Sequence, residues 1–277
     1  MKKGVFCLSL DTELLWGRHD GNWRLFEKNA LRVRPVIKKL LQLFKKYKIP
    51  ATWAIVGHLF LRNDTLPGWY ASDVVKAIKQ VDGQEIGSHS FFHTRFGSTP
   101  CTKERAEIEI RECVRLAKKE NIKLESFVFP YNSVRHLDIL KKYGFICFRG
   151  DDQYSTRSPL KKIQLLVDLF MPTGSPVYVP KQTNGLIEIP GSFYFLSARG
   201  FRRYIPKNVR FRKAKRGIDR AVAEKKIFHM WTHPIDLTIQ SEDLLDDIEQ
   251  ILAYACELRK EGVLSIHNMR QIAKQYS

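Results

Sequence analysis

The chain has 277 residues, of which 44% are hydrophobic and 27% charged, as expected for a globular protein with a sizeable core. Its 47 basic and 29 acidic residues give a formal net charge of +18, which favours polyanionic partners without choosing among nucleic acid, anionic lipid and acidic polymers. No stretch is apolar over about 18 residues, so the sequence predicts no transmembrane helix.

The first residues, MKKGVFCLSLDTE, combine lysines with a short apolar run, as a signal peptide does. The run meets Asp11 within a few residues, so we predict a first β-strand there instead. The five cysteines are odd in number, widely spaced and without a C-x-x-C pair. That pattern is typical of buried free thiols in a reducing cytoplasm.

Apolar strand-like runs alternate with amphipathic stretches along most of the chain. The predicted strands cover 4–11, 51–57, 84–89, 126–131, 145–150, 185–192 and 226–233. The predicted helices cover 35–48, 102–120, 136–144 and 241–262. Because strands this apolar alternate with helices, we expect a parallel sheet covered by helices.

About seven such units in 277 residues favour one α/β barrel over two domains. An open doubly wound sheet is the alternative, although no G-x-G-x-x-G follows the first strand, which argues against a dinucleotide-binding version. The region from about 150 to 226 is the least regular, and we predict long loops there.

Chemically reactive side chains follow the predicted strands at the ends where a parallel barrel carries its active site. These residues are Asp11, Glu13, His89, His93, Tyr131, Arg149, Asp151, Asp152 and His233. Their convergence from several strands is the main evidence in the sequence for an enzyme. His229, deeper on the last of these strands, is predicted to be a buried structural histidine.

The histidine pair in EIGSHSFFHTRFG is the most specific local signal. A spacing of four predicts that both rings lie on one side of a helical turn, within reach of one ion. Two imidazoles need a third ligand, normally a carboxylate, and Asp11 or Glu13 is placed to supply it. We therefore predict a metal site that includes His89 and His93.

The segments SLDTE, HSFFH, FPYN and MWTH, in this order, resemble the polysaccharide deacetylase family, also called NodB-homology or carbohydrate esterase family 4. The longer segments SLDTELLWG, EIGSHSFFH, FVFPYN and FRGDD resemble a subgroup encoded with surface-polysaccharide assembly in bacteria. The resemblance covers most of the chain. It implies that 1–277 form one distorted (β/α)7 TIM-like barrel that binds a divalent metal, usually zinc, and deacetylates an N-acetylated sugar.

The resemblance also assigns roles to single positions. Asp11 is expected to be the general base, and His233 the general acid that protonates the departing amine. Tyr131 is expected to offer its backbone N–H to the oxyanion. The residues expected to bind substrate are Arg149, Asp151 and Trp231.

This chain departs from the family in its first motif. The second of two adjacent aspartates, normally a metal ligand beside the two histidines, is replaced by Thr12. Three possibilities follow. Glu13 reaches the metal from the loop, Asp11 is itself the ligand and the base is another residue, or no metal is bound, as in related cyclic-amide hydrolases.

Two later motifs differ as well. Val128 stands where the third motif usually has an arginine, and we expect Arg149 to orient Asp11 in its place. The aspartate-tryptophan fourth motif is not evident, and Asp151 or Asp152 is the expected replacement.

Residues 200–226 hold much of the excess positive charge. They form either a solvated helix-and-loop face or an interfacial segment on anionic lipid, with Phe201, Tyr204, Ile205 and Phe211 interleaved among the cations. The second interpretation suits a cytoplasmic deacetylase, peripheral at the inner face of the membrane, whose N-acetyl sugar is nucleotide- or lipid-linked.

No nucleic-acid motif accompanies the charge, so no nucleic-acid partner is expected. The alternative functions are a metal-independent hydrolase of another linear or cyclic amide and a non-catalytic glycan-binding barrel.

Overall fold

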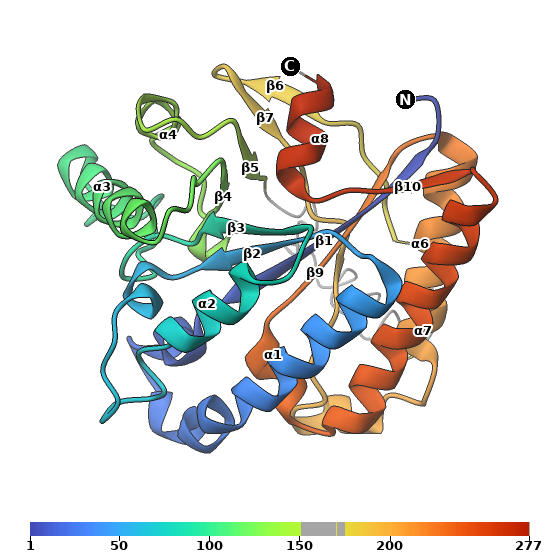
Figure 1. Cartoon of the computed structure of the whole chain (residues 1–277), viewed down its shortest axis with the longest axis horizontal. Helices are drawn as coiled ribbons and strands as arrows, with labels where there is room; N and C mark the ends of the chain where they lie inside the picture. Colours follow the sequence, from blue (N-terminus) through green and yellow to red (C-terminus); the bar gives the residue numbers. More distant parts are fainter. Residues whose placement is uncertain (151–169, 171–174, 277) are drawn as a thin grey trace.

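The structure is a computed structural model that describes residues 1–150, 170 and 175–276. Its strands are β1 Gly4–Thr12, β2 Ala51–Ile55, β3 Gln84–Ser88, β4 Ser126–Val128, β5 Cys147–Arg149, β6 Lys181–Thr183, β7 Leu186–Glu188, β8 Phe193–Tyr194, β9 Ile227–Thr232 and β10 Leu264–Ile266. They form one curved sheet in the order β6-β7-β5-β4-β3-β2-β1-β9-β8, with β10 paired to β1 (Figure 1).

The pairing in this sheet is parallel except at one edge, where β6 and β7 form an antiparallel hairpin. The hairpin turns through Asn184 and Gly185, both at positive φ, as a two-residue turn requires. Among the described residues, the end strands β6 and β8 are not paired to each other, and an isolated bridge joins Tyr178, which precedes β6, to Ile227 of β9. The sheet is therefore a curled, incompletely closed barrel, as the predicted distorted barrel requires.

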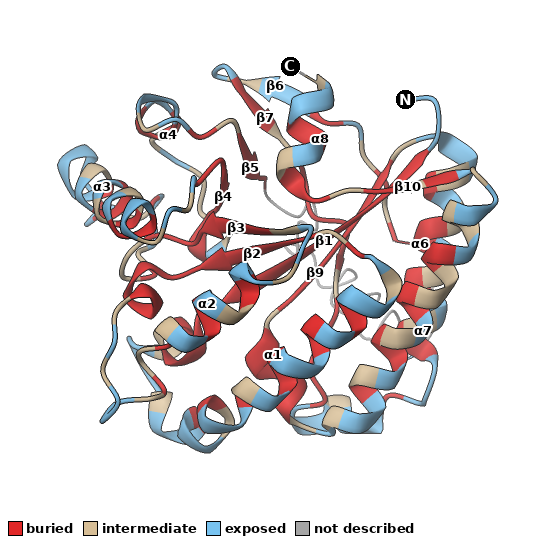
Figure 2. Ribbon diagram, in the orientation of Figure 1, coloured by how far each residue is buried: buried red, intermediate tan, exposed pale blue. Residues whose placement is uncertain are grey.

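Helices cover the outside of the sheet (Figure 1). They are α1 Glu27–Tyr47, α2 Ser72–Lys79, α3 Lys103–Lys119, α4 Leu137–Lys142, α6 Val209–Glu224, α7 Ser241–Lys260 and α8 Met269–Tyr276. Short 3-10 turns follow several strands: η1 Leu14–Arg18, η2 Trp23–Phe26, η3 Gly57–Phe60, η4 Pro130–Asn132, η5 Gly200–Tyr204 and η6 Pro234–Thr238. Figure 2 shows that most strands and the inward faces of the helices are buried, whereas β6 is exposed.

Each predicted strand segment contains a strand, and each predicted helix is present. The prediction of long loops through 150–226 is wrong over α6, whose buried face includes Ala214, Gly217, Ile218 and Ala221. Apart from Ile218, these side chains are small and give a weak apolar signal among so many cations. Within the described ranges, no helix is both long and apolar enough to span a bilayer.

A buried carboxylate fixes α8, which the sequence analysis did not predict, across one end of the barrel. Glu85 of β3 accepts hydrogen bonds from the Thr52 and Ser126 hydroxyls and from the backbone N–H of Arg270. Burial raises the pKa of Glu85, although these hydrogen bonds oppose the shift. Its partners are all structural, so this buried acid has a packing role.

Candidate active site

The end of β1 delivers two carboxylates to one face of the barrel. Side chains alternate along a strand, so Asp11 and Glu13 point the same way, and both are buried. The chain then leaves the strand, because Glu13 has helical φ and ψ and Leu14 has a φ of +47°. This turn starts η1 and brings the Glu13 carboxylate over the ends of the neighbouring strands.

The histidine pair follows β3 in a bent loop, and the expected helical turn between the two residues is wrong. Ser90 and His93 both adopt positive φ, which tightens the loop enough to bring the rings of His89 and His93 to a centroid distance of 4.9 Å. The two histidine rings therefore lie close together as predicted, but a bent loop brings them together and not a helical turn.

A residue that sequence analysis missed holds this loop in place. Glu109 of α3 is fully buried and accepts hydrogen bonds from the backbone N–H groups of Phe91 and Phe92 and from the Thr94 hydroxyl. An acid on the buried face of α3, between Ala106 and Ile110, was the available signal. Satisfying several loop donors with one carboxylate fixes the loop conformation.

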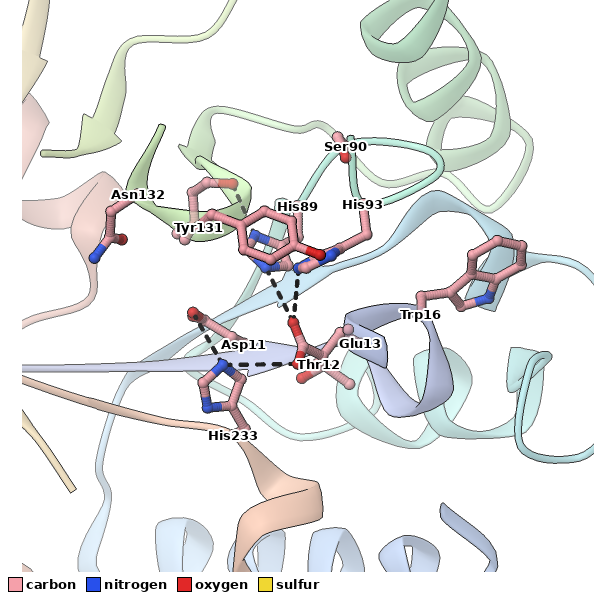
Figure 3. Close-up of polar contacts among 12 residues, drawn as sticks. Asp11, Thr12, Glu13, Trp16, His89, Ser90, His93, Tyr131, Asn132 and His233 are labelled. Atoms are coloured by element: carbon pink, nitrogen blue, oxygen red, sulfur yellow. Dashed lines mark hydrogen bonds and ion pairs between the residues drawn. The ribbon is translucent and has the colours of Figure 1, made fainter. Parts of the chain in front are cut away.

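Glu13, His89 and His93 form a three-residue cluster whose candidate ligand atoms lie within 4.8 Å of one another (Figure 3). Glu13 Oε2 is 2.8 Å from His93 Nε2 and 3.5 Å from His89 Nε2. Burial acts to raise the pKa of Glu13. The imidazoles of His233, His93 and His89 favour the carboxylate and outweigh burial, so the pKa lies well below its usual range.

The tautomer of His89 shows that this cluster suits a cation. His89 Nδ1 lies 2.8 Å from the carbonyl oxygen of Val128, and a carbonyl only accepts, so Nδ1 carries the proton. When the ring is neutral, Nε2 is a lone pair, and it faces the Glu13 carboxylate. Either a proton or a metal ion can join these two groups, and two imidazoles with one carboxylate are a ligand set used by catalytic zinc.

Asp11 forms a buried, bidentate ion pair with Arg149 of β5. The two guanidinium nitrogens of Arg149 lie 2.7 Å and 2.6 Å from the two Asp11 oxygens, and Arg149 is 1% exposed. Burial opposes ionisation of Asp11, but Arg149 outweighs it and lowers the pKa of the carboxyl group. The expected contact between these residues is present, and it holds Asp11 in one orientation as a carboxylate.

Arg149 in turn lies over Trp231 of β9, with the guanidinium carbon 4.2 Å from the ring centroid. Both residues were predicted to bind substrate, and both are buried. Asp151 and Asp152, the other acids predicted near the site, lie outside the described residues. His229 is buried as predicted, and its ring nitrogens face the Pro190 carbonyl and the Ser9 hydroxyl.

His233 follows β9 and faces both carboxylates of the first motif. Its Nε2 lies 3.7 Å from Glu13 Oε1 and 3.9 Å from Asp11 Oδ2 (Figure 3). On the other side, Nδ1 lies 3.2 Å from Asp236 and 3.1 Å from the Tyr194 hydroxyl. Burial disfavours the imidazolium, but Glu13, Asp236 and Asp11 outweigh it and raise the pKa of His233 to about 9.

Asp236 and Tyr194 were missed as partners of His233. Asp236 lies three residues after it, in the segment HPID, and this close spacing was the only signal. The Tyr194 hydroxyl also donates to the Asp236 carboxylate. The pair therefore fixes the orientation of the His233 ring from the side away from Glu13.

Tyr131 begins the loop after β4 and stands at the mouth of the site. It has a φ of +58°, and its ring centroid is 4.8 Å from that of His93. The Tyr131 hydroxyl donates to Asp20 at 3.1 Å, and the Arg95 guanidinium lies over the ring. These contacts fix the backbone turn whose N–H was expected to face an oxyanion.

The site thus combines a cluster of candidate metal ligands, an oriented carboxylate and a histidine paired with acids. Residues 24–147, which include both histidines of the cluster, match the family model described as polysaccharide deacetylase. Over this span, which is less than half of the chain, the sequence is similar to polysaccharide deacetylases. A comparison with curated proteins finds no match.

Solved structures share the fold of this chain. A Mycobacterium smegmatis protein described as a polysaccharide deacetylase has a TM-score of 0.71 at 11% identity, covering 99% of this chain and 91% of its own. A Pseudomonas aeruginosa PAO1 protein with the same description has a TM-score of 0.70 at 12% identity, covering 98% and 90%. Puue allantoinase has a TM-score of 0.67 at 14% identity, covering 99% and 91%.

Gly17 makes room for the Glu13 carboxylate, which leads to a first prediction. A Cβ atom on residue 17 would lie 1.8 Å from Glu13 Oε1 and 2.2 Å from Cδ. We expect Gly17→Ala to displace the carboxylate and to weaken zinc affinity, measured by competition with a chelator, by about 10- to 100-fold. Gly21→Ala is the control, because a Cβ there meets nothing within 4 Å. Equal affinities in both variants would show that Glu13 does not hold zinc in this position.

Proposed function

We propose that the chain is a metal-dependent hydrolase that removes the N-acetyl group from a sugar, with residues 1–277 acting as one deacetylase barrel. The observation that carries this proposal is the convergence of Glu13, His89 and His93 beside the Asp11–Arg149 pair. The match of residues 24–147 to the polysaccharide deacetylase family model supports the same reaction class.

In this proposal the three-residue cluster holds a divalent cation, for which zinc suits the ligand set. Such an ion supplies Lewis acidity, which polarises the acetamide carbonyl and makes water a stronger nucleophile. This assignment selects the first of the three possibilities for the first motif, since Asp11 is already engaged by Arg149 while Glu13 faces both imidazoles.

The remaining residues handle protons and charge. Asp11, kept ionised and oriented by Arg149, accepts a proton from the water that attacks the acetyl carbonyl. The backbone N–H of Tyr131 donates to the developing oxyanion. His233, oriented by Asp236 and Tyr194, donates a proton to the sugar nitrogen as the carbon–nitrogen bond breaks, because an unprotonated amine leaves poorly.

A metal-independent hydrolase of another amide is the second candidate, favoured by two observations. Thr12 replaces the aspartate that is normally a ligand, and the fold matches Puue allantoinase at a TM-score of 0.67. In that case Glu13 would act as an acid or base near His93. A non-catalytic glycan-binding barrel is less consistent with a buried carboxylate held by arginine next to a paired histidine.

The substrate we propose is an N-acetyl sugar on a carrier, either a nucleotide or a lipid, used in assembling a bacterial surface polysaccharide. Support comes from the resemblance of the motifs SLDTELLWG and FRGDD and from the net charge of +18, which suits a phosphate-bearing carrier or an anionic membrane. A cytoplasmic enzyme peripheral to the inner face of the membrane would meet either carrier.

The test is acetate release from a panel of free, nucleotide-linked and lipid-linked N-acetyl sugars. We expect release from at least one carrier-linked sugar, and a fall of about 10²- to 10⁴-fold in Asp11→Asn. No release of acetate from the panel, together with turnover of a cyclic or linear amide, would reject the deacetylase and favour the second candidate, a hydrolase of another amide.

A further inference from the structure

Three large apolar side chains stand in solvent on two turns at the barrel rim. Leu25 of η2 is 68% exposed, while Phe201 and Tyr204 of η5 are 54% and 67% exposed. We call Leu25, Phe201 and Tyr204 the rim patch. Single exposed apolar residues are common on proteins, but several grouped on neighbouring turns often mark an interaction surface.

Arginines join the two turns that carry the rim patch. The guanidinium of Arg199, immediately before η5, lies 3.9 Å from the ring centroid of Phe26 in η2. Arg18, at the end of η1, lies 4.9 Å from the same ring. Phe26 is itself buried, so it anchors both turns to the core and leaves the rim patch projecting outward.

Among the described residues, the arginines on or beside the two turns of the rim patch are not paired with acids. Residues 199–216 contain nine basic residues and no acidic residue. Five arginines on or beside the two turns form no ion pair with any residue whose structure is described. They are Arg18, Arg24, Arg199, Arg202 and Arg203.

After η5, the basic segment has buried apolar side chains and cations paired with acids, so the candidate interaction surface is limited to the rim patch and its arginines. Ile205 is buried and Phe211 packs against the core, so neither belongs to an exposed apolar face. Along and just before α6, cations pair with acids. The pairs are Lys207–Asp243, Lys215–Asp219 and Arg220–Glu224. An interfacial segment spanning all of 200–226 is therefore not supported. Its first turn, η5, does combine exposed apolar side chains with arginines that form no ion pair with a described residue.

The rim patch lies on the same edge of the sheet as the candidate active site. η1 and η2 follow Glu13 at the end of β1, and Gly17 of η1 touches the Glu13 carboxylate. η5 follows β8, whose Tyr194 contacts His233. A surface bound at the rim patch would therefore stand beside the mouth of the site.

We propose that the rim patch and its five arginines dock the protein on a bilayer that contains anionic lipids. Leu25, Phe201 and Tyr204 enter the headgroup region, and the arginines pair with lipid phosphates. Anionic lipid fits better than a hydrated acidic polymer, because a polymer offers no apolar layer for these side chains. The further consequence, that docking presents a lipid-linked sugar to the site, rests on the proposed function.

Co-sedimentation with vesicles tests the docking directly. Wild type is expected to bind vesicles of mixed neutral and anionic lipid and to bind purely neutral vesicles weakly. Arg202→Gln/Arg203→Gln should bind the anionic vesicles about 30-fold more weakly, since each basic residue near such a surface contributes about 1 kcal/mol. Leu25→Ser/Phe201→Ser/Tyr204→Ser should weaken binding by about tenfold or more.

Lys215→Gln/Arg220→Gln, which removes two cations from α6, is the matched control and should stay within about threefold of wild type. Equal binding of neutral and anionic vesicles, wild-type binding by the rim variants, or an equal loss in the α6 control would each overturn the proposal. So would a dimer that the triple serine variant dissociates without losing vesicle binding.

Activity on a soluble sugar separates this proposal from the proposed function. The rim variants should release acetate from a soluble N-acetyl sugar at the wild-type rate. Vesicle binding without any acetate release would retain the docking surface and reject the deacetylase. Acetate release without preference for anionic vesicles would retain the deacetylase and reject the docking surface.

Discussion

Glu13→Gln is expected to purify without bound zinc and to lose about 10²- to 10⁴-fold of acetate release, because several kcal/mol of transition-state stabilisation depend on the ion. Glutamine keeps the size of the side chain but removes the charge that faces His89 Nε2 and His93 Nε2 at 3.5 Å and 2.8 Å. Elemental analysis of the purified protein measures the metal, and the acetate assay measures the rate.

Glu27→Gln is the matched control, since it removes one carboxylate from the exposed first turn of α1. It should retain about one zinc per chain. His89→Ala/His93→Ala should repeat the loss seen in Glu13→Gln. Metal retained in Glu13→Gln but lost in the double alanine variant would indicate that a different carboxylate completes the site.

Arg149→Met is expected to destabilise the protein by about 3–5 kcal/mol and to lower acetate release strongly. The substitution leaves the Asp11 carboxylate buried without its partner, and uncompensated buried charges carry costs of this size. Asp11→Asn/Arg149→Met should recover much of that stability, because it removes the stranded charge, and yet remain inactive. Urea denaturation midpoints measure the stability of each variant.

The double variant tests the source of the lost stability. Its inactivity carries no information on Arg149, because Asp11→Asn alone is expected to remove the general base. A double variant no more stable than Arg149→Met would contradict the assignment of the Asp11–Arg149 pair as the source of the lost stability.

The parts of the site that follow strand order were predictable from the sequence. Parallel strands end on one edge, so reactive residues placed after β1, β3 and β9 had to meet there. That rule located Asp11, His89 and His233 without a structure. The choice between Asp11 and Glu13 as ligand depended on the turn at Leu14 and on space at Gly17, neither of which a side-chain pattern encodes.

Contacts between distant segments were harder to predict. Glu109 supports the histidine loop from a helix, and its role depends on how α3 packs. Asp236 looked like an ordinary loop acid until the turn after His233 placed it against the ring. The Arg149–Asp11 contact was predictable only because the family's usual arginine was missing, which made another cation necessary.

The basic segment was the least predictable region. Its charge hid the small-residue face of α6, so the buried face of this helix was not expected in a segment predicted to be a solvated helix-and-loop face or an interfacial segment. Only the structure distinguishes cations that face acids, such as Lys215, from those at the rim, such as Arg202. Leu25 could not have been grouped with Phe201 from sequence, because more than 170 residues separate them.

The central claim is that Glu13, His89 and His93 form a metal site required for deacetylation. The most direct measurement is acetate release by chelator-stripped protein titrated with zinc, using whichever N-acetyl sugar the wild type accepts. The metal-dependent mechanism predicts negligible release from the stripped protein and recovery that saturates at about one equivalent of zinc per chain. Full activity in the stripped protein, unchanged by zinc, would contradict it.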